Sequence, residues 1–336
     1  MVRLSLDGWI RLLVAALVVI VVVVLVASTA VTNIEPVIGR DFPDPAVLAT
    51  GGSYYAYSTQ SVYGGRFWHV PVQRAPELAG GWKAVGDALP ALPGWASSAH
   101  NGVGDVTAPE VTAGPGGGYL LYFVAMAGAR PVRCIGVASA ASPAGPFLAE
   151  PGPLVCQPDT VDSIDPQVFT DVDGARYLLY SSGGHGTAIW LQRMTPDGLG
   201  LLGARRALIQ ADRPEEAYIV EAPSLVRQGG EYVLFYSGNT FNSGSYFANY
   251  ARSPSLAGTF VKSPGEFVTR DSMGGAYINP GGQSVVHGEG QDDLVFHASL
   301  GPAERAMFAV GLTWDPAGRP VLDLSDGLTR RYRAAG

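Results

Sequence analysis

Three carboxylates stand close to prolines at widely separated points of the chain. Asp44 and Asp165 each directly precede a proline, and Glu221 precedes an Ala-Pro pair. Taken singly, an aspartate before proline often does no more than cap a turn. Three acids in one small cavity could not all ionise freely, so their pKa values would separate. Hydrolysis of a glycosidic bond needs a proton donor and a second carboxylate, so we predict Asp44, Asp165 and Glu221 as catalytic residues.

The three acids occupy or adjoin the first position of an internal repeat. Each repeat reads as a short apolar strand, a turn with Gly or Asp, and a second strand with alternating aromatic residues, which is the pattern of a β-hairpin. The repeats begin at Asp44, Ala108, Asp165, Ala222 and Gly281. In this alignment Gly282 takes the place of the proline, and the repeats follow one another at intervals of about 60 residues.

A repeat of about 60 residues with about four strands has the size of a propeller blade. We therefore predict an all-β fold, a five-bladed β-propeller over residues 34–336 that folds as one domain. The inner strand of each blade lines the central channel, so equivalent positions on separate blades converge at one mouth. Glu110 follows its proline, and strand alternation predicts that it faces away from the three acids.

An apolar segment precedes the repeats. The chain from Leu12 to Val31 carries no charge and follows Arg3 and Arg11, and its length is sufficient to span a bilayer. We predict that residues 1–33 form a single transmembrane helix, a signal-anchor. The alternative is a signal peptide that is cleaved near Ala30. The propeller is then either an extracytoplasmic domain anchored to the membrane or a secreted protein.

Composition restricts the remaining chemistry. The 44 glycines and 25 prolines favour short strands joined by tight turns, and the net charge of −7 without a basic run argues against nucleic acid as a partner. Cys134 and Cys156 both follow the apolar segment, where an even number of cysteines favours a disulfide over two buried thiols. The five histidines show no paired spacing for a metal, so a zinc site is not expected.

Three stretches resemble glycoside hydrolase family 43. They are Asp41-Phe-Pro-Asp-Pro-Ala-Val, Ser163-Ile-Asp-Pro-Gln-Val-Phe, and Val220-Glu-Ala-Pro-Ser-Leu-Val, and the likeness extends over roughly residues 40 to 325. The resemblance implies that Asp44 is the general base and Glu221 the general acid, with Asp165 orienting the acid and raising its pKa. It also implies inversion at the anomeric carbon, with roughly 6.5 to 9.5 Å between base and acid. Arg305 matches a substrate-contacting arginine of many members.

Other positions depart from the family pattern or remain open. Thr107 stands where members commonly have a tryptophan that walls the sugar pocket, so the pocket is expected to differ in shape. Many members carry a channel histidine in blade five that supports a calcium ion, whereas this sequence has Gln283 there. A glutamine carbonyl can bind calcium, so a structural calcium ion stays open and no cofactor is required. Phe42 is the candidate aromatic platform for a sugar ring, with ordinary channel packing as the alternative.

Three hypotheses follow for function. The first is an exported inverting glycosidase acting on a polysaccharide or oligosaccharide that contains arabinose or xylose. Arabinofuranosidase or arabinanase is favoured over xylosidase, because the chain ends soon after the fifth repeat. The second is a non-catalytic sugar-binding propeller, prompted by Thr107 and Gln283. The third is a retaining fructan-type hydrolase, which Ile164 before Asp165 and Ala222 after Glu221 disfavour.

Overall fold

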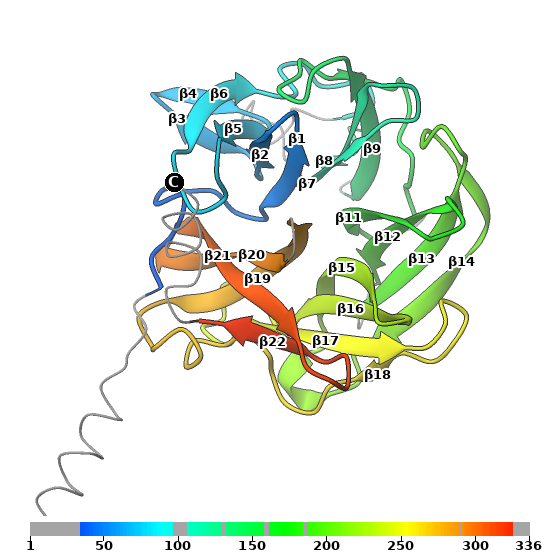
Figure 1. The fold of residues 1–336 in the computed structure, drawn as a ribbon. Coiled ribbons are helices and arrows are strands. Elements are labelled where there is room, and N and C mark those ends of the chain that lie inside the picture. Colours follow the sequence, from blue (N-terminus) through cyan, green and yellow to red (C-terminus); the bar gives the residue numbers. More distant parts are fainter. Residues whose placement is uncertain are drawn as a thin grey trace, which may run out of the picture. The chain divides into compact units, whose positions relative to one another are not determined.

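Strands account for nearly all the regular structure of this chain. The computed structural model describes residues 34–96, 106–128, 132–157, 161–183, 187–288 and 291–324. Within them, five four-stranded sheets surround a central axis, and a separate two-stranded hairpin lies beside the first sheet (Figure 1). The prediction of an all-β, five-bladed propeller is confirmed.

Each blade is a meander of antiparallel strands that follow one another from the axis outwards. Blade one holds β1 (Ala46–Thr50), β2 (Ser53–Tyr57), β5 (Pro71–Ala75) and β6 (Lys83–Asp87), with β3 (Ser61–Tyr63) and β4 (Arg66–Trp68) as the extra hairpin. Blade two holds β7 (Thr107–Ala113), β8 (Tyr119–Met126), β9 (Arg133–Ala140) and β10 (Leu148–Ala149). Blade three holds β11 (Ser163–Thr170), β12 (Arg176–Ser182), β13 (Ala188–Met194) and β14 (Leu201–Gln210). After the short 3-10 helix η1 (Pro214–Glu216), blade four holds β15 (Val220–Gln228), β16 (Glu231–Gly238), β17 (Phe247–Ser253) and β18 (Val261–Lys262). Blade five holds β19 (Ile278–His287), β20 (Asp292–Gly301), β21 (Glu304–Trp314) and β22 (Pro320–Asp323).

The first hairpin of a blade depends on its turn residues. Gly51 and Gly52 join β1 to β2 with φ of 57° and 67°. Gly229 and Gly230 join β15 to β16 with φ of 59° and 88°. Two consecutive residues with positive φ give the backbone twist that matches paired strands, and glycine adopts that conformation at no steric cost. The glycine turns noted in the sequence therefore set the register of these hairpins.

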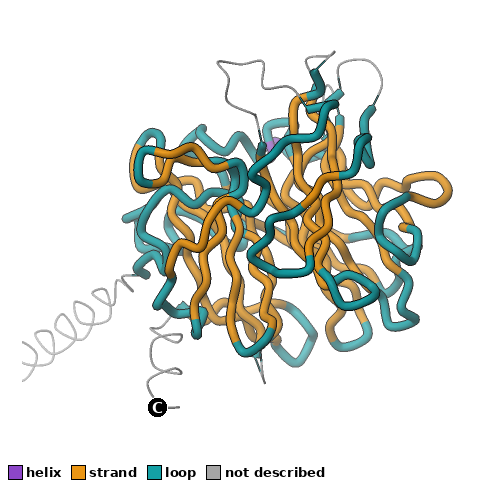
Figure 2. The backbone as a smooth tube through the Cα atoms, turned by 90° about the horizontal axis from the view of Figure 1, so that it is seen from above, coloured by secondary structure: helices purple, strands orange, loops and turns teal. Residues whose placement is uncertain are grey.

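Apolar side chains pack between neighbouring blades. Phe235 of blade four and Phe296 and Phe308 of blade five are fully buried in one such cluster. Each inner strand contacts the inner strand of the next blade, and β19 contacts β1, so the five sheets form a closed ring. Seen from the side, strands make up the body of the ring, and loops connect them at its two ends (Figure 2).

The ring is closed by the first described residues. The Val37 N–H donates to the carbonyl of Met307 at 2.9 Å, and the Phe42 N–H donates to the carbonyl of Arg305 at 2.6 Å. This segment pairs with the first half of β21, while β22 pairs with its second half. Blade five therefore depends on residues from both ends of the described chain.

Two further predictions concern the amino-terminal segment and the two cysteines. The predicted transmembrane or signal segment, residues 1–33, lies outside the described residues. In the described ranges no helix is both long and apolar enough to cross a membrane. In blade two, the structure joins Cys134 to Cys156 by a disulfide.

The closure predicts a specific loss of stability. Ile38 is 3% exposed and packs at the junction of blades one and five, so Ile38→Ala should lower the free energy of unfolding by about 2–4 kcal/mol. Urea unfolding of the full chain measures this loss. The matched control is Val62→Ala, because Val62 is 64% exposed and its truncation should change stability by less than about 0.5 kcal/mol. Equal effects of the two substitutions would contradict this account of ring closure.

Candidate active site

At the inner end of each blade, the residue at one equivalent position lies in the left-handed region of backbone space. The φ values are 52° at Asp44, 46° at Ala108, 55° at Asp165, 52° at Ala222 and 60° at Gly282. For a residue other than glycine this conformation costs roughly 1 kcal/mol, and such strain is common at functional sites. In blades two, three and four the strand pairing skips two residues at this point. Blade five skips two residues at the same point, whereas in blade one Asp44 and Pro45 precede β1. The left-handed residue turns the chain toward the channel at each blade entrance.

In blade five, the structure shifts the alignment of the internal repeats by one residue. The Leu225 N–H donates to Gln167 Oε1 of the preceding blade, and the Val285 N–H donates to Ser224 Oγ in the same way. Val285 is therefore the equivalent of Leu225. This places Gln283, and not Gly282, at the position of the proline. Gly282 then takes the left-handed position.

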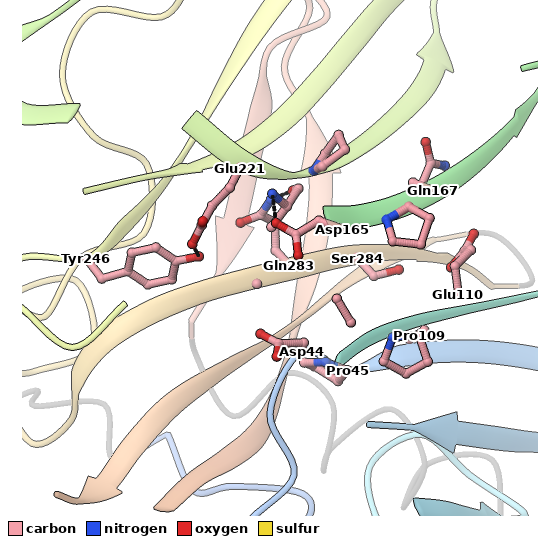
Figure 3. Close-up of a pocket in the computed structure, with 16 residues that line it drawn as sticks. Asp44, Pro45, Pro109, Glu110, Asp165, Gln167, Glu221, Tyr246, Gln283 and Ser284 are labelled. Carbon is pink, nitrogen blue, oxygen red and sulfur yellow. Dashed lines mark hydrogen bonds between the residues drawn. The ribbon is translucent and has the colours of Figure 1, made fainter. Parts of the chain in front are cut away.

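The five left-handed turns surround one pocket. The pocket and the open solvent at its mouth together enclose about 480 Å³. Asp44, Asp165 and Glu221 approach it from three different blades (Figure 3). Tyr246 lines it from the connection between β16 and β17. The other lining residues come from the blade entrances: Pro45, Ala46, Ala108, Pro109, Glu110, Pro166, Gln167, Ala222, Pro223, Gly282, Gln283 and Ser284. The structure thus brings the three predicted acids together at the axis.

Asp44 is held among cationic and hydrogen-bonding groups. Arg305 Nη1 lies 3.2 Å from Asp44 Oδ1, and Thr59 Oγ1 donates to Asp44 Oδ2 at 2.6 Å. His297 Nδ1 accepts the backbone N–H of Asp44 at 3.1 Å and lies 3.3 Å from Oδ1. Burial alone would raise the pKa of Asp44, but the Arg305 charge, His297 and Thr59 outweigh it and hold that pKa well below its usual range. Asp44 is therefore ionised at neutral pH.

Asp165 and Glu221 experience the opposite balance. Burial, followed by the negative charge of Asp44, raises the pKa of Asp165 to about 7. Burial, followed by the charge of Asp165, raises the pKa of Glu221 to about 8. Asp165 Oδ2 accepts the Ala222 N–H at 2.9 Å, which fixes it beside the residue that follows Glu221. The two acids are electrostatically linked, so near neutral pH they hold a proton as a pair.

Glu110 also lines the pocket, contrary to the sequence prediction. The pairing of β7 with β8 skips the two residues between Thr107 and Glu110, which breaks the alternation on which that prediction relied. Burial raises the pKa of Glu110 to about 8. A fourth acid therefore faces the channel, largely in its neutral form.

The predicted substrate-binding residues have different outcomes. Phe42 is 0% exposed and packs with Ile38 and Met307, so a sugar ring cannot stack on it and its assignment as a platform is wrong. Thr107 begins β7 and is not among the residues that line the pocket. Gln283 lines it, and Arg305 contacts Asp44 at its edge.

Sequence reasoning missed three residues at the site. His297 is fully buried on β20, and the signal that could have found it is a lone histidine inside an apolar run. Tyr246 precedes β17 and hydrogen bonds to Glu221. Phe241, 45% exposed, lies 4.9 Å from the Arg305 guanidinium. Tyr246 and Phe241 lie in the connection between β16 and β17. The hairpin pattern of the sequence does not predict where the side chains of such a connection lie.

The residues proposed for calcium do not fit that ion. Gln283 Oε1 accepts from Ser237 Oγ at 2.8 Å, and its amide donates to the Ala222 carbonyl at 2.6 Å. The nearby His297 Nε2 lies 3.5 Å from Arg305 Nη1, so a cationic side chain already adjoins the imidazole. In the ranges that the structure covers, no group of three or more His, Cys, Asp or Glu side chains could hold a metal. Gln283 and His297 are therefore engaged with protein groups in place of a calcium ion.

Hydrolysis of a glycosidic bond requires two carboxyl groups in different protonation states, and the pocket at the mouth of this propeller contains such groups. Residues 34–320 match the family described as glycosyl hydrolases family 43, and the chain belongs to that family. It is a glycosidase, and the family is the one that the sequence motifs resembled.

Three similar proteins illustrate the relationship. The extracellular endo-α-(1→5)-L-arabinanase 1 of Bacillus subtilis is 27% identical over 215 residues, which cover 61% of this chain and 64% of that protein. The probable arabinan endo-1,5-α-L-arabinosidase A of Emericella nidulans is 25% identical over 273 residues, covering 77% of this chain and 79% of the relative. The crystal structure of an endo-1,4-β-xylanase from Bacteroides thetaiotaomicron has a TM-score of 0.72 at 26% identity, covering 86% of this chain and 96% of the other.

The raised pKa of Glu221 predicts a pH-dependent gain in stability on substitution. Its neutral form is favoured in the folded state, so its stabilising contribution is complete below the ordinary pKa of 4.5 and is lost as pH rises toward about 8. Glu221→Gln cannot ionise and should be more stable than the wild type at pH 8 by roughly 1–3 kcal/mol, with a smaller difference at pH 5. Urea unfolding at the two pH values measures it.

The control for this prediction is Glu77→Gln, which changes an exposed glutamate outside the pocket. It should leave stability unchanged at both pH values. A gain for Glu221→Gln that is equal at pH 5 and pH 8 would show that ionisation of Glu221 is not its cause.

Proposed function

We propose that this chain is an exported, inverting glycosidase that cleaves arabinose-containing glycans, with α-1,5-linked arabinan as the substrate. The observation that carries the reaction is the separation of pKa values within one pocket, where Asp44 is ionised while Asp165 and Glu221 hold a proton as a pair. An acid and a base ready at the same pH are what single-displacement hydrolysis requires.

Asp44 is the general base and Glu221 the general acid. The Asp44 carboxylate accepts a proton from a water molecule as its oxygen attacks the anomeric carbon. The bond from that carbon to the leaving oxygen breaks, its electron pair stays on the oxygen, and Glu221 supplies the proton. The products are a sugar with inverted anomeric configuration and a free hydroxyl on the leaving chain. Solvent then removes the proton from Asp44 and returns one to Glu221.

Asp165 keeps Glu221 protonated until the proton passes to the leaving oxygen. Its charge raises the pKa of Glu221, and its bond to the Ala222 N–H holds it next to that residue. Arg305 has the corresponding effect on Asp44, because its positive charge keeps the base ionised. Neither residue exchanges a proton with the substrate in this scheme.

The choice of arabinan rests on two curated relatives that are arabinan-cleaving enzymes by name. A xylan substrate is the second candidate, because a structural neighbour at 26% identity is an endo-1,4-β-xylanase. Export is supported by the uncharged segment from Leu12 to Val31 and by the extracellular relative from Bacillus subtilis. Retention of that segment as a membrane anchor is part of the proposal.

Substitution of the acid and the base tests the mechanism. Asp44→Asn and Glu221→Gln should each reduce kcat by about 10²–10⁴-fold, because each removes one proton transfer from the transition state. The anomer formed first by the wild type, followed by proton NMR, should be the inverted one. Wild-type turnover in either variant, or a retained anomer, would exclude this assignment of roles.

A substrate panel tests the specificity. Linear arabinan, debranched arabino-oligosaccharides, xylan and xylo-oligosaccharides are compared at equal concentration by release of reducing ends. Arabinan should be hydrolysed with a higher kcat/KM than xylan. The opposite order would move the proposal to xylan, and calorimetric binding of a glycan without its hydrolysis would favour a sugar-binding role instead.

A further inference from the structure

A tyrosine hydroxyl contacts the carboxyl group assigned as general acid. Tyr246 Oη donates to Glu221 Oε1 at 2.7 Å, and the ring is 3% exposed. Tyr246 lies immediately before β17, whereas Glu221 lies on β15 of the same blade. Figure 3 shows the hydroxyl directed at the carboxyl group at the edge of the pocket. The two proton transfers of the hydrolysis do not themselves require this contact.

The tyrosine ring is fixed from two sides. The His297 ring lies parallel to it, with 5.9 Å between centroids and 6° between planes. On another side is Gly281, where an added Cβ would lie 2.2 Å from Tyr246 Cε1 and 2.6 Å from Cδ1. Any side chain at position 281 would therefore displace the ring. Its neighbour Gly282 leaves room in the same way for His297 and Asp44.

We propose that Tyr246 is a positioning residue for the general acid. Its hydroxyl donates a hydrogen bond to Oε1 of Glu221, so Oε2 is the oxygen that carries the proton to the leaving group. The inference rests on the proposed function, since it requires Glu221 to be the acid. The protonated form of a carboxyl group accepts a hydrogen bond best at its carbonyl oxygen, so a fixed donor at Oε1 selects Oε2 for the proton. An acid with a defined donor oxygen and a fixed rotamer needs no reorientation in the transition state.

The direction of this hydrogen bond is set by the environment of the tyrosine. Burial, followed by the charge of Glu221, raises the pKa of Tyr246 well above its usual value, so the hydroxyl keeps its proton and is the donor. A donated hydrogen bond stabilises the ionised carboxylate more than the neutral acid, so it lowers the pKa of Glu221 against the effects of burial and of Asp165. Tyr246 therefore also limits how far the pKa of the acid rises.

Tyr246→Phe removes only the hydroxyl group and tests the proposal in the full chain. Two substrates are compared: an arabino-oligosaccharide, whose leaving alcohol needs a proton, and a nitrophenyl glycoside of the same oligosaccharide, whose leaving phenolate needs little help. Turnover of the first should fall by about tenfold or more, and turnover of the second should stay within about twofold of the wild type. KM for the two substrates should change little.

The pH profile of kcat separates positioning from structural damage. Loss of a donated hydrogen bond raises the pKa of Glu221, so the basic limb should move to higher pH by about one pH unit. A loosened pocket that admits water would instead lower that pKa and move the limb to lower pH. A limb that stays in place or moves down, or equal losses on the two substrates, would overturn the proposal.

A second variant reaches the same contact without changing the tyrosine. Gly281→Ala displaces the ring of Tyr246 and should reproduce the leaving-group dependence of Tyr246→Phe. The controls are Tyr122→Phe, which removes a buried hydroxyl bonded to the Gly198 carbonyl at 2.9 Å, and Gly152→Ala, at a position with no atom within 4 Å of the added Cβ. Both controls should match the wild type on both substrates.

Glu221→Gln distinguishes failure of the proposed function from failure of the inference about Tyr246. If it keeps wild-type turnover of the oligosaccharide, the proposed function fails, and the inference fails with it. If Glu221→Gln is impaired while Tyr246→Phe shows no leaving-group dependence, only the inference about Tyr246 fails.

Discussion

The left-handed residue at the entrance of every blade is the constraint on which the site depends. Four of these five positions hold a residue other than glycine, at a cost of roughly 1 kcal/mol each, and the closed ring of blades supplies the packing that maintains them. Because each turn is repeated about the same axis, its side chain or its neighbour is directed at a common point. Asp44 and Asp165 occupy two of these turns, and Glu221 immediately precedes a third, Ala222. The catalytic arrangement is thus a consequence of the repeated turn and of an acidic residue at or beside it in three of the five blades.

The same burial has different results for different acids in the pocket. Desolvation raises the pKa of every carboxyl group here, and the outcome depends on which groups oppose it. Asp44 has the Arg305 guanidinium at 3.2 Å and remains ionised, whereas Glu221 has Asp165 as its charged neighbour and retains its proton. Among the residues that the structure describes, blade five adds no acid to the lining of the pocket but supplies Arg305 and His297, which hold Asp44 in its ionised form. Gly281 leaves room for Tyr246, which donates to Glu221, and Gly282 leaves room for His297.

Much of the fold and the three acids could be predicted from the sequence, because both are expressed in local patterns that repeat. Hairpin turns recur at intervals of about 60 residues, and Asp-Pro or Ala-Pro pairs mark the inner ends of four of the five blades. Glu110 could not be placed correctly, because a bulge in the strand pairing is not visible in an alternating pattern. Phe42 was misassigned because its burial depends on the ring closure with β21. His297 and Tyr246 reach the pocket from a second strand and a loop, so only the assembled blades reveal them.

The central claim is that one pocket holds carboxyl groups with widely separated pKa values. A titration of the resting protein with ¹³C-labelled carboxyl groups, followed by NMR and assigned with Asp44→Asn, Asp165→Asn and Glu221→Gln, measures this directly. The account predicts that the Asp44 signal stays in its ionised position down to a pH below the ordinary value of 3.8, while Asp165 and Glu221 titrate near pH 7 to 8. Titration of all three groups together near pH 4 would contradict it.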